Sequence, residues 1–71
     1  MRYMVVIEEG ENGWGAYVPD LPGCAAVGES EEEVKKLIHD AIEFHLEDLS
    51  EAGAHIPPPM SKSDYVDVLA A

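Results

Sequence analysis

The chain has 71 residues, of which 46% are hydrophobic, which predicts a single domain with a small core. Fifteen acidic residues against four basic ones leave a formal net charge of −11, which disfavours binding to nucleic-acid phosphates or anionic membranes and favours basic partners or simple solubility. The lone Cys24 excludes an intrachain disulfide, and no apolar run matches a signal-peptide core or a membrane span. We therefore expect one cytoplasmic domain over residues 1–71.

Three stretches before the first helix signal have the composition of β-strands. Arg2–Glu9 is β-branched and aromatic in its middle, and Gly10–Gly13 after it favours a hairpin turn. Trp14–Pro19 resumes the strand pattern until proline ends it, and Cys24–Gly28 is a short third strand of small residues. Alternation in the second strand leaves Tyr17 on one face and assigns the other face to Trp14, Ala16 and Val18.

The second and third strands are joined by the segment PDLPG, residues 19–23. Its residue types are those of tight turns, with Pro19 and Asp20 first, Leu21 and Pro22 next, and Gly23 last. We expect a chain reversal here, in which glycine adopts a backbone geometry that a Cβ atom would hinder. Gly28, at the end of the third strand, is expected to serve the same purpose.

A long helix follows. Ser30 and Glu33 form a capping-box pattern, and acidic residues around them complement the positive end of the helix dipole. Gly53 has the position of a left-handed residue just past the helix end, which gives a helix of roughly twenty residues. The predicted apolar stripe consists of Val34, Leu37, Ile38, Ala41, Ile42, His45, Leu46 and Leu49.

The chain after the helix is expected to be extended. Pro57–Pro59 fix the backbone, and Asp64–Ala70 alternates in the manner of a final strand. The predicted order is β-β-β-α-β, a two-layer α+β fold in which antiparallel hairpin strands pack on one long helix. The last strand can join the sheet as a parallel or an antiparallel edge, and the sequence leaves open whether it pairs within its own chain.

The residues that commonly carry chemistry do not form a convincing site. His39 and His45 lie six positions apart and do not share a helix face, and His55 has no neighbour at metal-ligand spacing. Cys24 has no basic neighbour to activate it and is interpreted as a small buried residue. We expect no catalytic residue, no metal and no cofactor. An alternative is a metal-dependent nuclease remnant that uses acids such as Asp20.

The whole set of motifs, in order and at these spacings, resembles the HicB family of antitoxin-type proteins, from the first strand to the proline run. The resemblance is carried by Tyr17 with the PDLPG turn, Gly28, Ser30 with Glu33, Ala41-Ile42 with Leu46-Glu47, and Gly53 before Ile56-Pro57. It implies a partial ribonuclease-H-like fold. It also implies binding and neutralisation of a small basic mRNA-cleaving toxin, HicA, whose active site the antitoxin covers.

The resemblance and the charge together predict a partner-binding surface without catalysis. The candidates for contacting the basic toxin are Asp20, Glu29, Glu31, Glu32 and Asp40. Family members commonly carry a C-terminal DNA-binding domain, and the sequence to Ala71 shows none, so direct DNA binding is not expected. The small core also favours a homodimer or a higher oligomer. An orphan homo-oligomeric scaffold without a toxin partner stays open as the main alternative.

Overall fold

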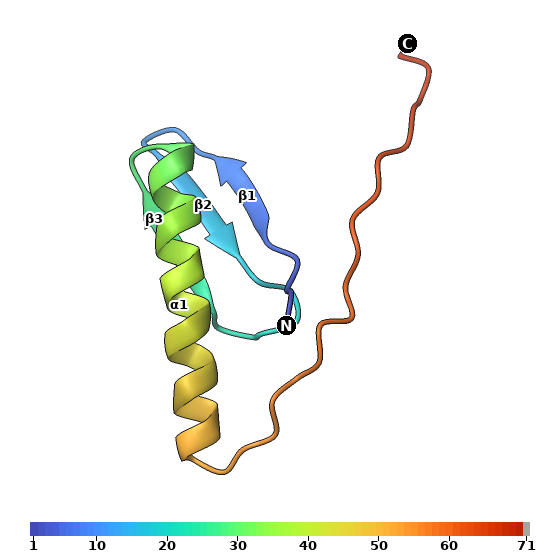
Figure 1. Ribbon diagram of the computed structural model, residues 1–71. Helices are drawn as coiled ribbons and strands as arrows, with labels where there is room; N and C mark the ends of the chain where they lie inside the picture. Colours follow the sequence, from blue (N-terminus) through green and yellow to red (C-terminus); the bar gives the residue numbers. More distant parts are fainter. Residues whose placement is uncertain (71) are drawn as a thin grey trace.

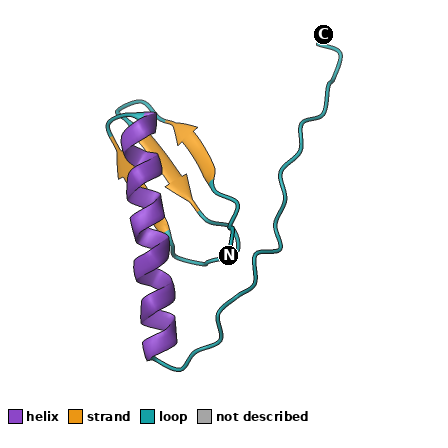
Figure 2. Cartoon of the chain, in the orientation of Figure 1, coloured by secondary structure: helices purple, strands orange, loops and turns teal. Residues whose placement is uncertain are grey.

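A computed structural model describes residues 1–70, in which a three-stranded antiparallel sheet is covered on one face by a single helix (Figures 1 and 2). The strands are β1 (Val6–Glu9), β2 (Trp14–Tyr17) and β3 (Ala25–Gly28), and they lie side by side in chain order. The helix α1 spans Glu31–Glu51. The predicted α+β class and the two-layer arrangement are confirmed. No helix within residues 1–70 is long and apolar enough to cross a membrane.

The core lies between α1 and the helix-facing side of the sheet. The pairing registers place Ile7, Ala16 and Ala26 in one row across the three strands, and this row faces the helix. Apart from Leu37, which is exposed, the predicted stripe of α1 is buried or half-buried. The fully or nearly fully buried side chains are Ala16, Val18, Leu21, Cys24, Val34 and Ile38. Six such residues make a small core, as the chain length predicts.

The PDLPG segment forms two β-turns in succession. Leu21 donates its backbone N–H to the carbonyl of Val18 at 3.0 Å, and Cys24 donates to the carbonyl of Leu21, also at 3.0 Å. Each turn therefore has a proline at its second position, where the fixed φ of proline fits. Gly23 is the third residue of the second turn and has φ +84°, as a type II turn requires. The turns direct the fully buried Leu21 into the core.

Both helix ends carry the predicted caps. The Ser30 hydroxyl accepts the backbone N–H of Glu33 at 3.1 Å, while the Glu33 carboxylate accepts the backbone N–H of Glu29 at 2.8 Å. The second bond reaches one residue further back than in the usual capping box. At the other end Gly53, with φ +68°, donates to Ser50, and Ala54 donates to Leu49, which is the Schellman pattern.

Gly28 allows α1 to begin close to β3. A Cβ atom at this position would lie 3.1 Å from the backbone nitrogen of Val34 and 3.0 Å from a carboxylate oxygen of Glu33. The first turn of the helix is therefore fitted to a residue without a side chain. Unlike Gly23, Gly28 does not have a positive φ, so the close approach of α1 is what favours glycine here.

The predicted fourth strand does not form within this chain. Residues 54–70 contain no strand, and Figure 1 shows this segment running from the end of α1 past the N-terminus and away from the sheet. The radius of gyration is 14.2 Å, whereas a compact domain of this length is expected near ~11 Å. The alternation of Asp64–Ala70 is thus that of a strand, but no neighbouring strand pairs with it here.

Candidate functional site

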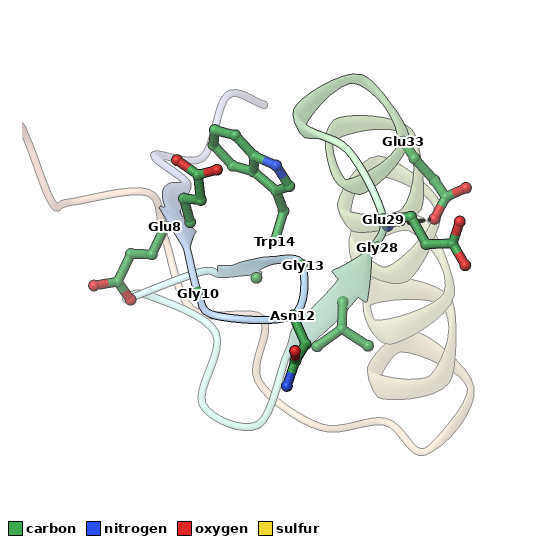
Figure 3. Close-up of a pocket in the computed structure, with 11 residues that line it drawn as sticks. Glu8, Gly10, Asn12, Gly13, Trp14, Gly28, Glu29 and Glu33 are labelled. Atoms are coloured by element: carbon green, nitrogen blue, oxygen red, sulfur yellow. Dashed lines mark hydrogen bonds between the residues drawn. The ribbon is translucent and has the colours of Figure 1, made fainter.

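A concave acidic surface lies at the end of the sheet where the β1–β2 hairpin turns and α1 begins. The concavity has a volume of about 740 Å³. Glu8 and Glu9 line it from β1, Glu29 lines it from the connection between β3 and α1, and Glu33 lines it from the first turn of α1 (Figure 3). The half-buried Trp14 lies on β2, the strand between β1 and β3, and it shares a face of the sheet with Glu9. We call these five residues the acidic surface.

Strand register explains why acids far apart in sequence meet here. Glu9 lies opposite Trp14 in the β1–β2 pair, and Trp14 lies opposite Gly28 in the β2–β3 pair. The three residues form one row across the sheet, so Glu29, which follows Gly28, comes to the same end as Glu9. Directly opposed residues share a face of an antiparallel sheet.

The chemistry of this surface is that of a receptor for basic side chains. No lysine or arginine lines the concavity, and within residues 1–70 no ion pair involves Glu8, Glu9 or Glu29. Carboxylates without cationic partners attract lysine and arginine side chains. The face of Trp14 offers an additional cation–π contact to the same groups.

Among the residues predicted to bind a partner, Glu29 belongs to the acidic surface. Glu31 and Glu32 are exposed in the first turn of α1 close to it, and Glu31 forms an ion pair with Lys35 at 3.1 Å. An exposed pair of this kind contributes at most about 0.5 kcal/mol, so the Glu31 carboxylate can leave Lys35 and bind a cation of a partner. Asp20 and Asp40 lie elsewhere. Sequence reasoning did not predict Glu8, Glu9 and Trp14 as one site, because their meeting with Glu29 depends on register.

Asp20 lies at the opposite end of the sheet and binds the chain's own C-terminal segment. One of its carboxylate oxygens accepts the backbone N–H groups of Met60 at 2.9 Å and Ser61 at 2.8 Å, and the other accepts the Ser61 hydroxyl at 2.7 Å. The hydrogen bond from the Ser61 backbone, followed by that from its hydroxyl, lowers the pKa of Asp20. The structure therefore gives Asp20 a role in anchoring residues 60 and 61.

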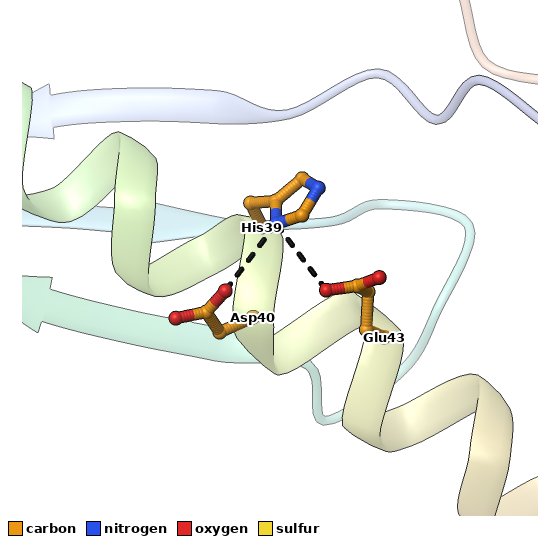
Figure 4. Close-up of polar contacts among 3 residues, drawn as sticks. All are labelled: His39, Asp40 and Glu43. Carbon is orange, nitrogen blue, oxygen red and sulfur yellow. Dashed lines mark hydrogen bonds and ion pairs between the residues drawn. The ribbon is translucent and has the colours of Figure 1, made fainter.

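Asp40 lies on the exposed side of α1 in a group with His39 and Glu43 (Figure 4). The Nδ1 atom of His39 lies 3.3 Å from a carboxylate oxygen of Asp40 and 3.5 Å from one of Glu43. Each of the three side chains offers a metal-ligand atom, and these atoms are within 4.8 Å of one another. All three side chains are exposed, and such acidic groups are common on helices without an ion. The group is therefore a solvated polar cluster.

Cys24 is buried beneath the PDLPG turns, and burial raises the pKa of its thiol. A thiol with a raised pKa is protonated at neutral pH and is a poor nucleophile. The interpretation of Cys24 as a core residue is confirmed.

Comparison with known proteins gives the family. The model of the "HicB_like antitoxin of bacterial toxin-antitoxin system" family matches residues 3–69. A UPF0150 protein of Helicobacter pylori strain J99 is 52% identical over 49 residues, which is 69% of this chain and 68% of that protein. Antitoxin HicB 2 of Photorhabdus laumondii is 36% identical over an alignment of 76 positions that covers this whole chain and 52% of the relative.

A phage relative and a solved structure agree with these matches. An uncharacterised 14.9 kDa protein of Haemophilus phage HP1 is 31% identical over 67 residues, or 94% of this chain and 50% of that protein. The chain thus spans about half the length of this relative and of the Photorhabdus antitoxin. A chain from a structure titled "HicA3 and HicB3 toxin-antitoxin complex" superposes with a TM-score of 0.67 and 29% identity, covering 82% of this chain and 72% of that one.

The fold and the motifs define an α+β domain of the antitoxin type. The chain belongs to the HicB-like antitoxin family of bacterial toxin-antitoxin systems.

Proposed function

We propose that this chain is a non-catalytic antitoxin that binds a small basic HicA-type mRNA-cleaving toxin and neutralises it by covering the toxin's active site. Membership of the HicB-like family supports the antitoxin role. The structural relative comes from a structure whose title names a HicA3 and HicB3 toxin-antitoxin complex, which supports a HicA-type partner.

The observation that carries this proposal is the acidic surface. Its four carboxylates and Trp14 line one concavity, and among residues 1–70 no lysine or arginine lines it. A basic protein that approaches a chain of net charge −11 is attracted over several ångströms before contact, and a concave acidic site concentrates that attraction. Lysine or arginine side chains of the toxin would then pair with the carboxylates and stack on the indole ring.

Two observations favour binding over catalysis. The Cys24 thiol is buried in the core and has a raised pKa, which removes it as a nucleophile. Both carboxylate oxygens of Asp20, the acid invoked for a nuclease remnant, accept hydrogen bonds from residues 60 and 61. These hydrogen bonds give Asp20 a structural role in holding the C-terminal segment, which explains the acid without a nuclease function.

The proposal is tested by the rate at which the chain associates with a purified HicA-type toxin. The informative variant is Glu8→Gln, Glu9→Gln and Glu29→Gln, which removes three charges from the acidic surface and leaves the capping residue Glu33 in place. The control is Glu47→Gln, Asp48→Asn and Glu51→Gln, which removes three charges from exposed positions at the far end of α1. At low salt we expect about tenfold slower association for the first variant and a smaller change for the control.

Raising the salt concentration should slow association of the wild-type chain, because exposed charges are screened over about 10 Å at 0.1 M salt. An association rate independent of salt would refute electrostatic steering. Equal slowing of the two triple variants would show that net charge acts without this particular surface. Failure of the wild-type chain to bind the toxin would leave the orphan homo-oligomer as the better description.

A further inference from the structure

Residues 62–70, which we call the C-terminal arm, expose apolar side chains that nothing else within residues 1–70 covers. Tyr65 is 96% exposed, Val66 79%, Val68 81% and Leu69 101%. The arm leaves the domain at a fixed point, because Asp20 binds Met60 and Ser61. An extended segment of this composition, held away from its own domain, is typical of a strand that lacks its partner.

The domain has an unfilled position for such a strand. β1 is an edge strand, since only β2 pairs with it, and so it presents unpaired backbone groups along its free side. Beside this edge a groove of about 320 Å³ runs between the N-terminal segment and α1. Its apolar walls are formed by Val5 and Ile7 on one side and by Ile38 and Ile42 on the other.

The charges of groove and arm are complementary. Of the four basic residues in the sequence, Arg2 and Lys35 line the groove, together with one acidic residue, Glu43. Lys35 also forms an exposed ion pair with Glu31. The arm begins with Lys62 and carries Asp64 and Asp67 on either side of Tyr65 and Val66, so its formal net charge is negative. A chain of net charge −11 repels a second copy over most of its surface, and this groove is a place where cations reduce that repulsion.

We propose that the C-terminal arm of one copy adds as a fourth strand to the β1 edge of a second copy, giving a two-fold symmetric dimer by reciprocal exchange. Alternation places Val66 and Val68 on one face of the arm, and this face would cover the groove next to Ile38 and Ile42. Nine extended residues span about 30 Å, more than twice the length of β1. Reciprocal exchange uses the same two surfaces in both copies and therefore closes the assembly.

The second copy, rather than the chain's own β1, is the occupant that the structure favours. The arm and the free edge belong to the same chain here, yet the arm runs past the N-terminus on the β1 side without pairing (Figure 1). Dimer formation does not depend on the proposed toxin binding, and it is measured in the absence of toxin.

The first test is the mass of the purified chain in solution by analytical ultracentrifugation. We expect a dimer for the wild-type chain and at least about a tenfold weaker dimer for the double variant Val66→Asp and Val68→Asp, which places charges on the buried face of the added strand. Both residues are exposed in the single chain, so the variant should keep its folded circular-dichroism spectrum. The matched control is Phe44→Asp, at a helix position 74% exposed and outside the groove, which should leave the dimer unchanged.

The second test identifies the copy that holds the arm. Val68→Cys in one chain and His39→Cys in a second chain of different mass place thiols in the arm and at the groove. Exchange predicts an oxidised product with the summed mass of the two chains. The proposal would be overturned by a monomeric wild-type chain, or by a dimer that Val66→Asp and Val68→Asp do not weaken. It would also be overturned if a disulfide formed only within a single chain that carries both Val68→Cys and His39→Cys, and not between two chains.

Discussion

Replacing Gly23 by valine is expected to destabilise the fold solely through the backbone. Gly23 has φ +84° in the second turn of the PDLPG segment, and no heavy atom lies within 4 Å of the place where a Cβ atom would be. A side chain would therefore meet no steric obstacle from its surroundings. The left-handed conformation itself costs an L-residue about 1–2 kcal/mol, and a β-branched side chain falls at or above the upper end of this range.

The loss is large for a domain of this size. Stability of ~0.05–0.15 kcal/mol per residue gives roughly 4–11 kcal/mol for the whole chain. A loss of about 2 kcal/mol should lower the midpoint of thermal unfolding by about 8–16 °C, since each kcal/mol shifts a small domain by ~4–8 °C. Urea and thermal unfolding followed by Trp14 fluorescence would measure both quantities.

A second substitution at the same position separates backbone strain from loss of space. Gly23→Asn should cost clearly less than Gly23→Val, because asparagine tolerates positive φ. Normal stability of the valine variant would refute this explanation of the turn. Equal destabilisation by asparagine and valine would show that the space around Gly23, and not its φ, is what matters.

Three further changes test other parts of the fold. Leu21→Ala should cost about 2–5 kcal/mol, because it empties a fully buried site, and urea unfolding would show an unchanged midpoint if Leu21 were not a core residue. Ser30→Ala should cost about 1 kcal/mol by removing the helix cap, and a loss below the error of the same assay would contradict the cap. For Asp20, hydrogen bonds from Ser61 and Met60 lower the pKa of the folded state, so the anchor is present above the ordinary pKa and is lost as pH falls through the lower one. The amide NMR shifts of Met60 and Ser61 should titrate with Asp20 and become pH-independent in Asp20→Asn, whereas titration persisting in that variant would exclude this anchor.

Local signals in the sequence account for most of the fold. Ser30 and Glu33 fix the start of α1, Gly53 fixes its end, and the prolines and Gly23 predict the turns, because each acts on backbone groups a few residues away. The alternation of apolar and polar residues in Asp64–Ala70 predicts an extended backbone. It does not specify which strand would pair with this segment. The expected strand is therefore extended and unpaired.

The candidate sites were less predictable because they depend on contacts between distant residues. Asp20 appeared in the sequence as a surface acid in a turn, and only the path of the chain brings residues 60 and 61 to it. Glu29 was predicted to face a partner, whereas Glu8 and Glu9 join it through the register of β1 on β2 and of β2 on β3. Charge predicted the kind of partner, and register determines where the acids gather.

The most direct test of the central claim is inhibition of a purified HicA-type toxin in an RNA-cleavage assay. We predict that the wild-type chain stops cleavage at about one chain per toxin, and that Glu8→Gln, Glu9→Gln and Glu29→Gln together shift the required concentration upward by about tenfold. The control variant Glu47→Gln, Asp48→Asn and Glu51→Gln should inhibit nearly as well as the wild-type chain. Undiminished RNA cleavage in the presence of excess wild-type chain would contradict the account.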